Sequence, residues 1–269
     1  MDVKLTNENI EKSAINPYAG AMEITKLQDF KGYLELLGLG HSYHDLWWRR
    51  NVRQHSPLTP WNYDRNVIFV HIPKTAGLSI YEMFGMDYPP DTHAPVAGYQ
   101  QADATLFKTA YKFAVVRNPW DRLVSAFHYL KHNAASPNEK QWSQDQNWAE
   151  RHLVKFSCFS QFMQALHAPD FRRLVLTWRH FIPQHYFLTS GGSDILVDHV
   201  IYYEDLQKGL EEVAHKIGVA LKPVHRNVSK RSGFRQYYRQ EDIDLVGSIY
   251  ARDIELFSYS FACASAAGG

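Results

Sequence analysis

One lysine lies in a short loop of small residues, Pro73-Lys74-Thr75-Ala76-Gly77-Leu78-Ser79. Residues 67–71 before this loop are mostly apolar and predict a short buried strand, and residues 79–84 after it predict the first turns of a helix. A helix start offers unpaired N–H groups and partial positive charge, and Lys74 adds a full positive charge. The spacing therefore predicts a loop that binds a phosphate group.

This loop differs from the nucleoside-triphosphate loop, whose pattern Gly-x-x-x-x-Gly-Lys-Ser/Thr puts the lysine after the glycines. Here Lys74 precedes Gly77, and no lysine follows that glycine within the loop. The sequence also lacks a clear acidic magnesium ligand after a strand. A kinase of the nucleoside-triphosphate class is therefore the disfavoured alternative.

A second unit of the same kind follows further along the chain. Residues 112–116 predict another buried strand, which leads directly into Arg117. Asn118 suits the N-cap of a helix, Pro119 suits the first helical position, and Asp121 falls in the first turn, where negative charge is favoured. Two strand–loop–helix units with basic residues indicate an anionic ligand held at both loops.

The second unit has its own candidate ligands. The Arg117 side chain is a planar fork suited to a phosphate group, and Ser125 lies two turns into the adjoining helix. A structural salt bridge is the alternative role for Arg117, and a helix-surface ion pair is the alternative for Arg122. The basic stretch 222–239 would close over an anion or would be a solvated loop.

The two units resemble motifs of the sulfotransferases that use 3′-phosphoadenosine 5′-phosphosulfate (PAPS). Residues 72–79 resemble the family's 5′-phosphosulfate motif, and residues 116–126 resemble its 3′-phosphate motif. Three later segments, Ile182-Pro183-Gln184, Tyr203-Glu204-Asp205-Leu206 and residues 250–257, are similar to the carbohydrate-type branch. The resemblance spans about residues 66–260.

The resemblance implies an α/β fold of the P-loop-like sulfotransferase type, with a central, mainly parallel sheet flanked by helices. It implies sulfuryl transfer from PAPS to a hydroxyl group, most simply on a carbohydrate or glycoconjugate, with the desulfated nucleotide PAP as product and without a metal. Protein tyrosine or a small metabolite stays open as the acceptor. A non-catalytic binder of nucleotides or sulfated glycans is the alternative outside the enzymes.

Residue roles follow from matching this chain to the family motifs. Lys74 is expected to stabilise the leaving phosphate oxygen. The family usually has Thr where this chain has Leu78, so one hydroxyl contact is lost. The expected cofactor-binding residues are Pro73, Lys74, Thr75, Ala76, Gly77, Leu78, Ser79, Arg117, Ser125, Lys230, Arg231 and Gly233.

A base must take the proton from the acceptor hydroxyl. His93 is our candidate, because the resembling enzymes often place a histidine in the loop after the first helix. Glu82, His71 and His128 are the other candidates. The histidines show no metal-ligand spacing.

Other segments must position these residues. Residues 22–37 predict a helix, and the aromatic patch at residues 43–50 is expected to pin an N-terminal extension (1–60) onto the main domain (61–262), with a disordered tail at 263–269. We expect a polar loop at 133–147 and a core helix at 156–166. We also expect a strand at 195–203, a helix from there to 217 and a last helix at 241–257.

Composition narrows the class of protein. The chain has 269 residues, of which 45% are hydrophobic and 21% charged, as in ordinary globular proteins. A net charge of +1 gives no signal for nucleic acid. The two cysteines are expected to be reduced thiols, and no apolar run approaches the roughly 18–20 residues that span a bilayer. We therefore expect a soluble, cytoplasmic, bacterial-type enzyme.

Overall fold

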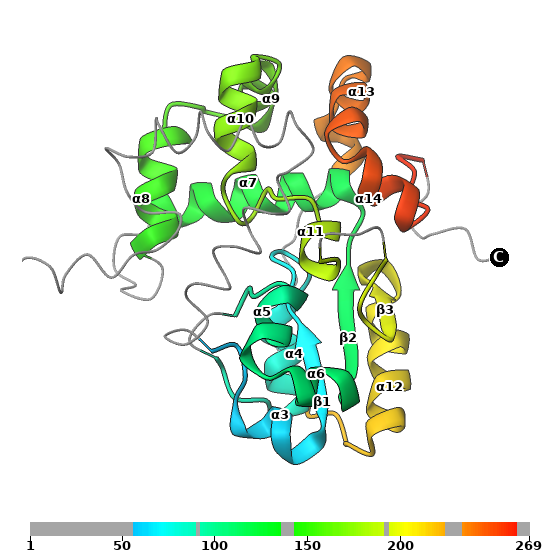
Figure 1. Ribbon diagram of the computed structural model, residues 1–269. Helices are drawn as coiled ribbons and strands as arrows, with labels where there is room; N and C mark the ends of the chain where they lie inside the picture. Colours follow the sequence, from blue (N-terminus) through cyan, green and yellow to red (C-terminus); the bar gives the residue numbers. More distant parts are fainter. Residues whose placement is uncertain (1–55, 90–91, 136–142, 191–193, 224–232, 263–269) are drawn as a thin grey trace, which may run out of the picture.

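The computed structural model describes residues 56–89, 92–135, 143–190, 194–223 and 233–262 (Figure 1). The expected helix at 22–37, the aromatic patch at 43–50, the tail and the candidate ligands Lys230 and Arg231 lie outside these residues. In the described ranges, no helix is long and apolar enough to cross a membrane.

A parallel sheet organises the described part of the chain. Its strands are β1 (Val67–Val70), β2 (Tyr111–Val116) and β3 (His199–Tyr202), in the order β1-β2-β3. Val67 pairs with Tyr111, and Phe113 pairs with His199. All three strands therefore end at the same edge of the sheet, so the two loops predicted to bind phosphate are neighbours in space. The expected α/β fold with a parallel sheet is confirmed.

Apolar side chains cover both faces of the sheet, since every residue of β1 is buried. On one face, Val67 and Phe69 pack with residues of α4 (Gly77–Phe84) and α12 (Leu206–Ile217). On the other, Ile68 and Val70 pack with residues of α5 (Val96–Ala102), α6 (Ala104–Thr109) and α11 (His185–Leu188). Helix α3 (Pro60–Arg65) leads into β1. The strands are thus fixed on both sides, and their ends have defined positions.

A helical layer lies beyond the carboxyl ends of the strands. Figure 1 shows α7 (Pro119–Ala135) running across this end of the sheet, with α8 (Ser143–His152), α9 (Phe159–Leu166), α10 (Pro169–Leu176) and α13 (Gln240–Ile249) on its far side. Leu123, Phe127 and Leu130 of α7 are buried in their shared aromatic core. Helix α7 therefore has the loops on one side and this core on the other.

Several predicted boundaries were wrong. The loop expected at 133–147 is shorter, because α7 continues to Ala135 and α8 begins at Ser143. The core helix begins at Phe159, and the strand expected at 195–203 is limited to β3. The last helix is two helices, α13 and α14 (Ala251–Leu256), which meet at Tyr250. The buried Tyr250 hydroxyl donates to the Phe181 carbonyl at 2.8 Å, a long-range contact that local patterns do not reveal. Two short 3₁₀ helices, η3 (Tyr203–Asp205) and η4 (Phe234–Tyr237), complete the described elements.

Candidate active site

The first loop, residues 71–76, joins β1 to α4 in an unusual backbone conformation. Lys74 and Ala76 both have positive φ, at 72° and 68°, which is rare for residues with a side chain. Ala76 is the N-cap of α4 and makes no side-chain cap hydrogen bond, so the N–H groups of the first turn have no side-chain acceptor there. Left-handed residues next to a helix start form a concavity of N–H groups that suits an anion.

Gly77 is required by the packing of His71. A Cβ atom added at Gly77 would lie 1.8 Å from His71 Nε2. The buried imidazole therefore occupies the space that any larger residue at the start of α4 would need. The glycine of the motif allows a histidine to pack beneath the loop.

A cavity of about 210 Å³ opens beside the first loop. Lys74 lines it, and its Nζ atom lies 3.6 Å from the ring centroid of Tyr129, in a cation–π contact from α7. This contact holds the ammonium group at the cavity wall. The full lining consists of His71, Lys74, Ala76, Gly77, Leu78, Ser79, Thr92, His93, Tyr129 and His180.

Three histidines meet at this cavity. The ring centroids of His71 and His93 are 4.5 Å apart, and those of His93 and His180 are 5.9 Å apart. His93 and His71 were thus brought to the site as the sequence suggested. The other two candidates lie elsewhere: Glu82 accepts from the Tyr88 hydroxyl, and His128 packs against Tyr237. Neither of them lines the cavity.

Sequence reasoning missed a group of side chains centred on Asp145 of α8. This carboxylate is 1% exposed and lies 2.9 Å from His180 Nε2. It also accepts from Arg179 at 2.8 Å and from the Tyr129 hydroxyl at 3.4 Å. Asp145 therefore supports both His180 and the tyrosine that contacts Lys74. The available sequence signal was the helical spacing of Asp145, Trp148 and Ala149, which are all buried. A charged aspartate at one of these positions does not indicate a buried helix face.

Burial keeps the histidines neutral. Burial, together with the nearby His180 and Lys74, lowers the pKa of His71 to about 3. The pKa of His93 falls well below its usual value, mainly through burial. Burial also lowers the pKa of His180, but Asp145 acts in the opposite direction. Burial alone would raise the pKa of Asp145, yet His180 and Arg179 hold that pKa well below its usual range, so the carboxyl group is ionised.

The second loop, residues 117–118, joins β2 to α7, and its arginine is occupied. The Arg117 guanidinium is 5% exposed and donates to Asp121 through Nε at 2.8 Å, with Nη2 at 2.7 Å from the same oxygen. Its Nη1 donates to the Lys74 carbonyl at 3.0 Å. In this structure Arg117 therefore makes the structural salt bridge that the sequence left open, and it holds the first loop. Its role toward a 3′-phosphate stays a prediction.

Arg122 does not form the surface ion pair that the sequence left open, and that alternative was wrong. Its side chain is 1% exposed, and it donates to three carbonyl groups, those of Pro73, His180 and Ile182. It thus ties the first loop to the segment before α11. Ser125 is buried one turn further along α7, on the face that also carries Arg122 and Tyr129, but it does not line the cavity.

The segments that resemble the carbohydrate-type branch fix the second loop. Gln184 Oε1 accepts from the Arg117 N–H at 2.9 Å, and Gln184 Nε2 donates to the Arg117 carbonyl at 2.8 Å. Glu204 accepts from the Asn118 N–H at 2.8 Å. Asp253, fully buried, accepts from the Gln184 N–H at 2.7 Å. Gln184 and Glu204 thus bind the backbone of the second loop, and Asp253 holds Gln184 in place.

The remaining candidate ligands differ in their positions. The Thr75 hydroxyl is buried and donates to the Ile72 carbonyl at 2.8 Å, so its proton is used inside the loop. Leu78 and Ser79 line the cavity, and Pro73 is held by Arg122. Gly233 lies at the start of η4 and is exposed, and it does not line the cavity.

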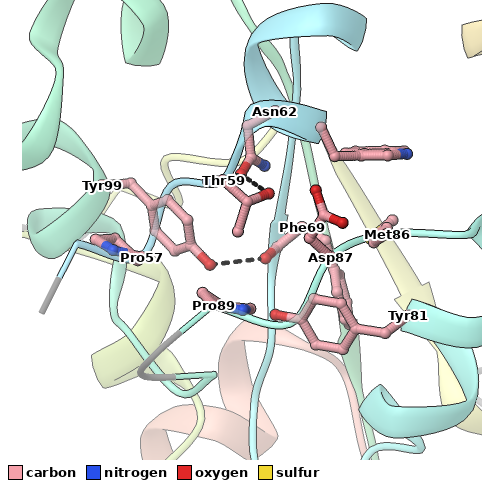
Figure 2. A pocket seen from close by; sticks show the side chains of 10 residues that line it. Pro57, Thr59, Asn62, Phe69, Tyr81, Met86, Asp87, Pro89 and Tyr99 are labelled. Atoms are coloured by element: carbon pink, nitrogen blue, oxygen red, sulfur yellow. Dashed lines mark hydrogen bonds between the residues drawn. The ribbon is translucent and has the colours of Figure 1, made fainter.

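A second, smaller cavity lies between α3 and β1 (Figure 2). Its volume is about 10 Å³, which is room for about one water molecule. Figure 2 shows the Tyr99 hydroxyl donating to the Phe69 carbonyl, a bond of 3.0 Å that anchors α5 to β1. The lining side chains serve packing, so the larger cavity is the candidate site.

The arrangement can bind an anion and move a proton. Lys74 and the backbone of the first loop supply positive charge, and the histidines supply proton acceptors. In the part of the chain that the structure covers, no three His, Cys, Asp or Glu side chains are grouped to hold a metal ion.

Comparison with known proteins identifies a family. A family model described as "Sulfotransferase family" matches residues 61–260, which is most of the chain and includes both loops. No curated protein and no solved structure matches the chain.

Proposed function

Since this chain belongs to the sulfotransferase family, we propose that it transfers the sulfuryl group of PAPS to a hydroxyl group of a carbohydrate or glycoconjugate. The observation that carries this proposal is the first loop. Its left-handed backbone, the start of α4 and Lys74 all surround one cavity, and buried histidines lie in the same cavity.

The residues of the first loop and of the start of α4 fit the phosphosulfate end of PAPS. Lys74, Ala76, Gly77, Leu78 and Ser79 line the cavity and would hold this end through N–H groups, the ammonium group and the Ser79 hydroxyl. The volume of about 210 Å³ is below the roughly 300–1,000 Å³ of pockets that hold whole ligands, so the cavity suits the reacting groups rather than the adenosine. PAPS supplies a sulfuryl group bonded to a phosphate leaving group.

Lys74 is assigned to the leaving group. Negative charge grows on the phosphate oxygen as the sulfuryl group departs, and a fixed ammonium group stabilises this charge more in the transition state than in the ground state. The Tyr129 ring restrains the Lys74 ammonium, which reduces the reorganisation that would otherwise oppose this effect.

A cavity histidine is assigned to the acceptor proton. The sequence put forward His93, which lines the cavity together with Lys74. A neutral imidazole is needed for this role, and burial keeps the pKa of His93 well below its usual value, so the ring is neutral at pH 7.

The carbohydrate acceptor rests on the likeness of segments 182–184, 203–206 and 250–257 to the carbohydrate-type branch. The acceptor class is tested by offering sugars, tyrosine peptides and small phenols with labelled PAPS. Labelled product from a sugar supports the proposal, whereas transfer to tyrosine alone would contradict it.

Cofactor choice is tested by calorimetric titration with PAP, and with ATP plus magnesium as the control. We expect PAP to bind without metal and more tightly than ATP. Preference for ATP with magnesium would overturn the proposal in favour of a kinase. PAP binding without transfer to any acceptor would favour the non-catalytic binder that Leu78 suggests.

A further inference from the structure

His180 is buried at the cavity like His71, but it also contacts a buried carboxylate. It lines the cavity, its side chain is only 4% exposed, and its Nε2 atom lies 2.9 Å from the buried Asp145 carboxylate. Its other ring nitrogen, Nδ1, is buried and has no hydrogen-bond partner among the residues that the structure describes. A carboxylate on one nitrogen and an unpaired second nitrogen is the arrangement of a proton acceptor.

The tautomer of His180 follows from its partner. Asp145 is ionised, because His180 and Arg179 outweigh the effect of burial on its pKa, and an ionised carboxylate only accepts hydrogen bonds. The hydrogen between the two groups therefore belongs to His180 Nε2. In the neutral ring, Nδ1 then carries a lone pair.

The surroundings of His93 are different. Its Nδ1 lies 3.3 Å from the Thr92 hydroxyl, and the described groups that shift its pKa include no carboxylate. Burial is the main cause of its lowered pKa, and the neighbouring His71, Arg179, His180 and Lys74 lower it further. A proton placed on His93 would therefore lie near the positive charges of Lys74 and Arg179, whereas a proton on His180 would be stabilised by Asp145.

We propose that His180 Nδ1, with Asp145 holding Nε2–H, takes the proton of the acceptor hydroxyl. This assignment rests on the proposed sulfuryl transfer and replaces His93 as the base. As the acceptor O–H bond breaks, its proton moves to Nδ1 and the acceptor oxygen bonds to sulfur. The bond between sulfur and the phosphate oxygen breaks, and its electron pair remains on the phosphate beside Lys74. Asp145 is a positioning residue, which fixes the tautomer and stabilises the imidazolium.

The surroundings of His180 are mixed in charge. Asp145 of α8 is the acidic group in contact with it, and Tyr129 of α7 packs at 5.1 Å between ring centroids. Arg179 and Lys74 lower the pKa of His180, and His180 in turn lowers the pKa values of the neighbouring His71 and His93.

The first test compares variants in steady-state transfer from labelled PAPS, to methyl glycosides or to water. His180→Gln should lower kcat about 100-fold or more, the scale of general-base catalysis. The matched control is His167→Gln, because His167 also pairs with an aspartate, Asp242 at 3.1 Å, and does not line the cavity. That variant should stay within twofold of wild type. His180→Gln turnover within threefold of wild type would overturn the proposal.

The Asp145→Asn variant distinguishes a positioning role of Asp145 from a purely structural role. Asp145 raises the pKa of His180, so its removal should lower that pKa and move the acid limb of the kcat/KM profile to lower pH. A purely structural role would reduce the folded fraction and leave the limb in place. An unchanged limb would therefore reject Asp145 as the positioning residue.

The second test needs no turnover. Nitrogen-15 NMR of histidine-labelled protein should show the Nε2–H tautomer at His180, assigned by its loss in His180→Gln. The Nδ1–H tautomer would overturn the proposal even if transfer is confirmed. Conversely, failure of the wild-type protein to bind PAP would remove the proposed function and leave the tautomer result standing as a property of the site.

Discussion

The first and second loops begin at adjacent strands and precede α4 and α7, yet different parts of the chain hold them. Side chains of the second unit fix the carbonyl groups of the first loop, since Arg117 binds Lys74 and Arg122 binds Pro73. The second loop is instead fixed by later segments, through Gln184 and Glu204. The carbonyl groups of Pro73 and Lys74 thus accept hydrogen bonds from the second unit, whereas the start of α4 lines the cavity.

The two loops therefore differ in the roles that we assign to them, catalysis for the first and structural support for the second. In the first loop, the backbone has left-handed residues and Lys74 reaches the cavity wall. In the second loop, the buried arginine is paired with Asp121 and the neighbouring backbone groups are paired. We therefore infer that the first loop serves the ligand and that the second loop supports the first. Substitutions in the two loops should consequently change different measured quantities.

The largest expected effect is on turnover, from Lys74→Met. This change keeps an unbranched side chain of nearly the same length and removes its charge, so we expect kcat to fall about 10²–10³-fold, as for loss of one donor to a developing oxyanion. The free energy of unfolding should change by less than about 1 kcal/mol. Steady-state assays and urea unfolding measure the two quantities.

The matched control for this change is Lys155→Met. Lys155 also contacts aromatic rings, at 5.1 Å from Phe156 and 5.3 Å from Phe171, but it does not line the cavity. It should keep wild-type turnover. A Lys74→Met enzyme within a few-fold of wild type would remove the catalytic role of the first loop and with it the contrast between the loops.

The second expected effect is on stability, from Gln184→Ala. This change leaves the buried N–H and carbonyl of Arg117 without their partner, and each unpaired group costs about 1–3 kcal/mol. We expect the free energy of unfolding to fall by about 2–5 kcal/mol in urea titration. Turnover per folded molecule should change much less than in Lys74→Met.

Gln207→Ala serves as its comparison, because Gln207 is exposed on α12 and donates to Glu211 one turn away. Its effect on stability should stay within about 0.5 kcal/mol. Equal losses of stability in the two variants would show that the hydrogen bonds of Gln184 to the Arg117 backbone do not stabilise the protein more than an exposed side-chain pair does.

The sequence predicted the parts of the site that are local. Both strand–loop–helix units were found, because in each unit the apolar run and its turn residues are close in the chain. These turn residues are Pro73 in the first unit, and Asn118 and Pro119 in the second. The group around Asp145 was missed for a physical reason. Its members come from three separate segments, and the segment 133–147, where Asp145 lies, looked polar enough to be a loop. Only the packing of α8 against α7 brings Asp145 to Tyr129 and His180.

Arg117 also shows what the sequence could not predict, although here the residue itself was identified. Its type and its position at the strand end suggested a phosphate ligand, a role that stays a prediction. Its burial against Asp121 and its bond to the Lys74 carbonyl depend on the tertiary structure. A local motif thus identified the residue but did not determine which partner it has.

The smallest expected effect concerns this choice of partner, and it tests whether the second loop also binds the nucleotide. If Arg117 exchanges Asp121 for the 3′-phosphate, Arg117→Ala should weaken PAP binding about tenfold or more, because a hydrogen bond to a charged group contributes about 1.5–3 kcal/mol. Turnover at saturating PAPS should fall much less. Asp121→Asn should keep or tighten PAP binding, since it removes only the competing negative charge. If both variants lower the stability of the protein and leave the PAP affinity unchanged, then Arg117 is wholly structural. Nucleotide binding would in that case belong to the first loop and to groups outside the second, which would sharpen the contrast between the two loops rather than blur it.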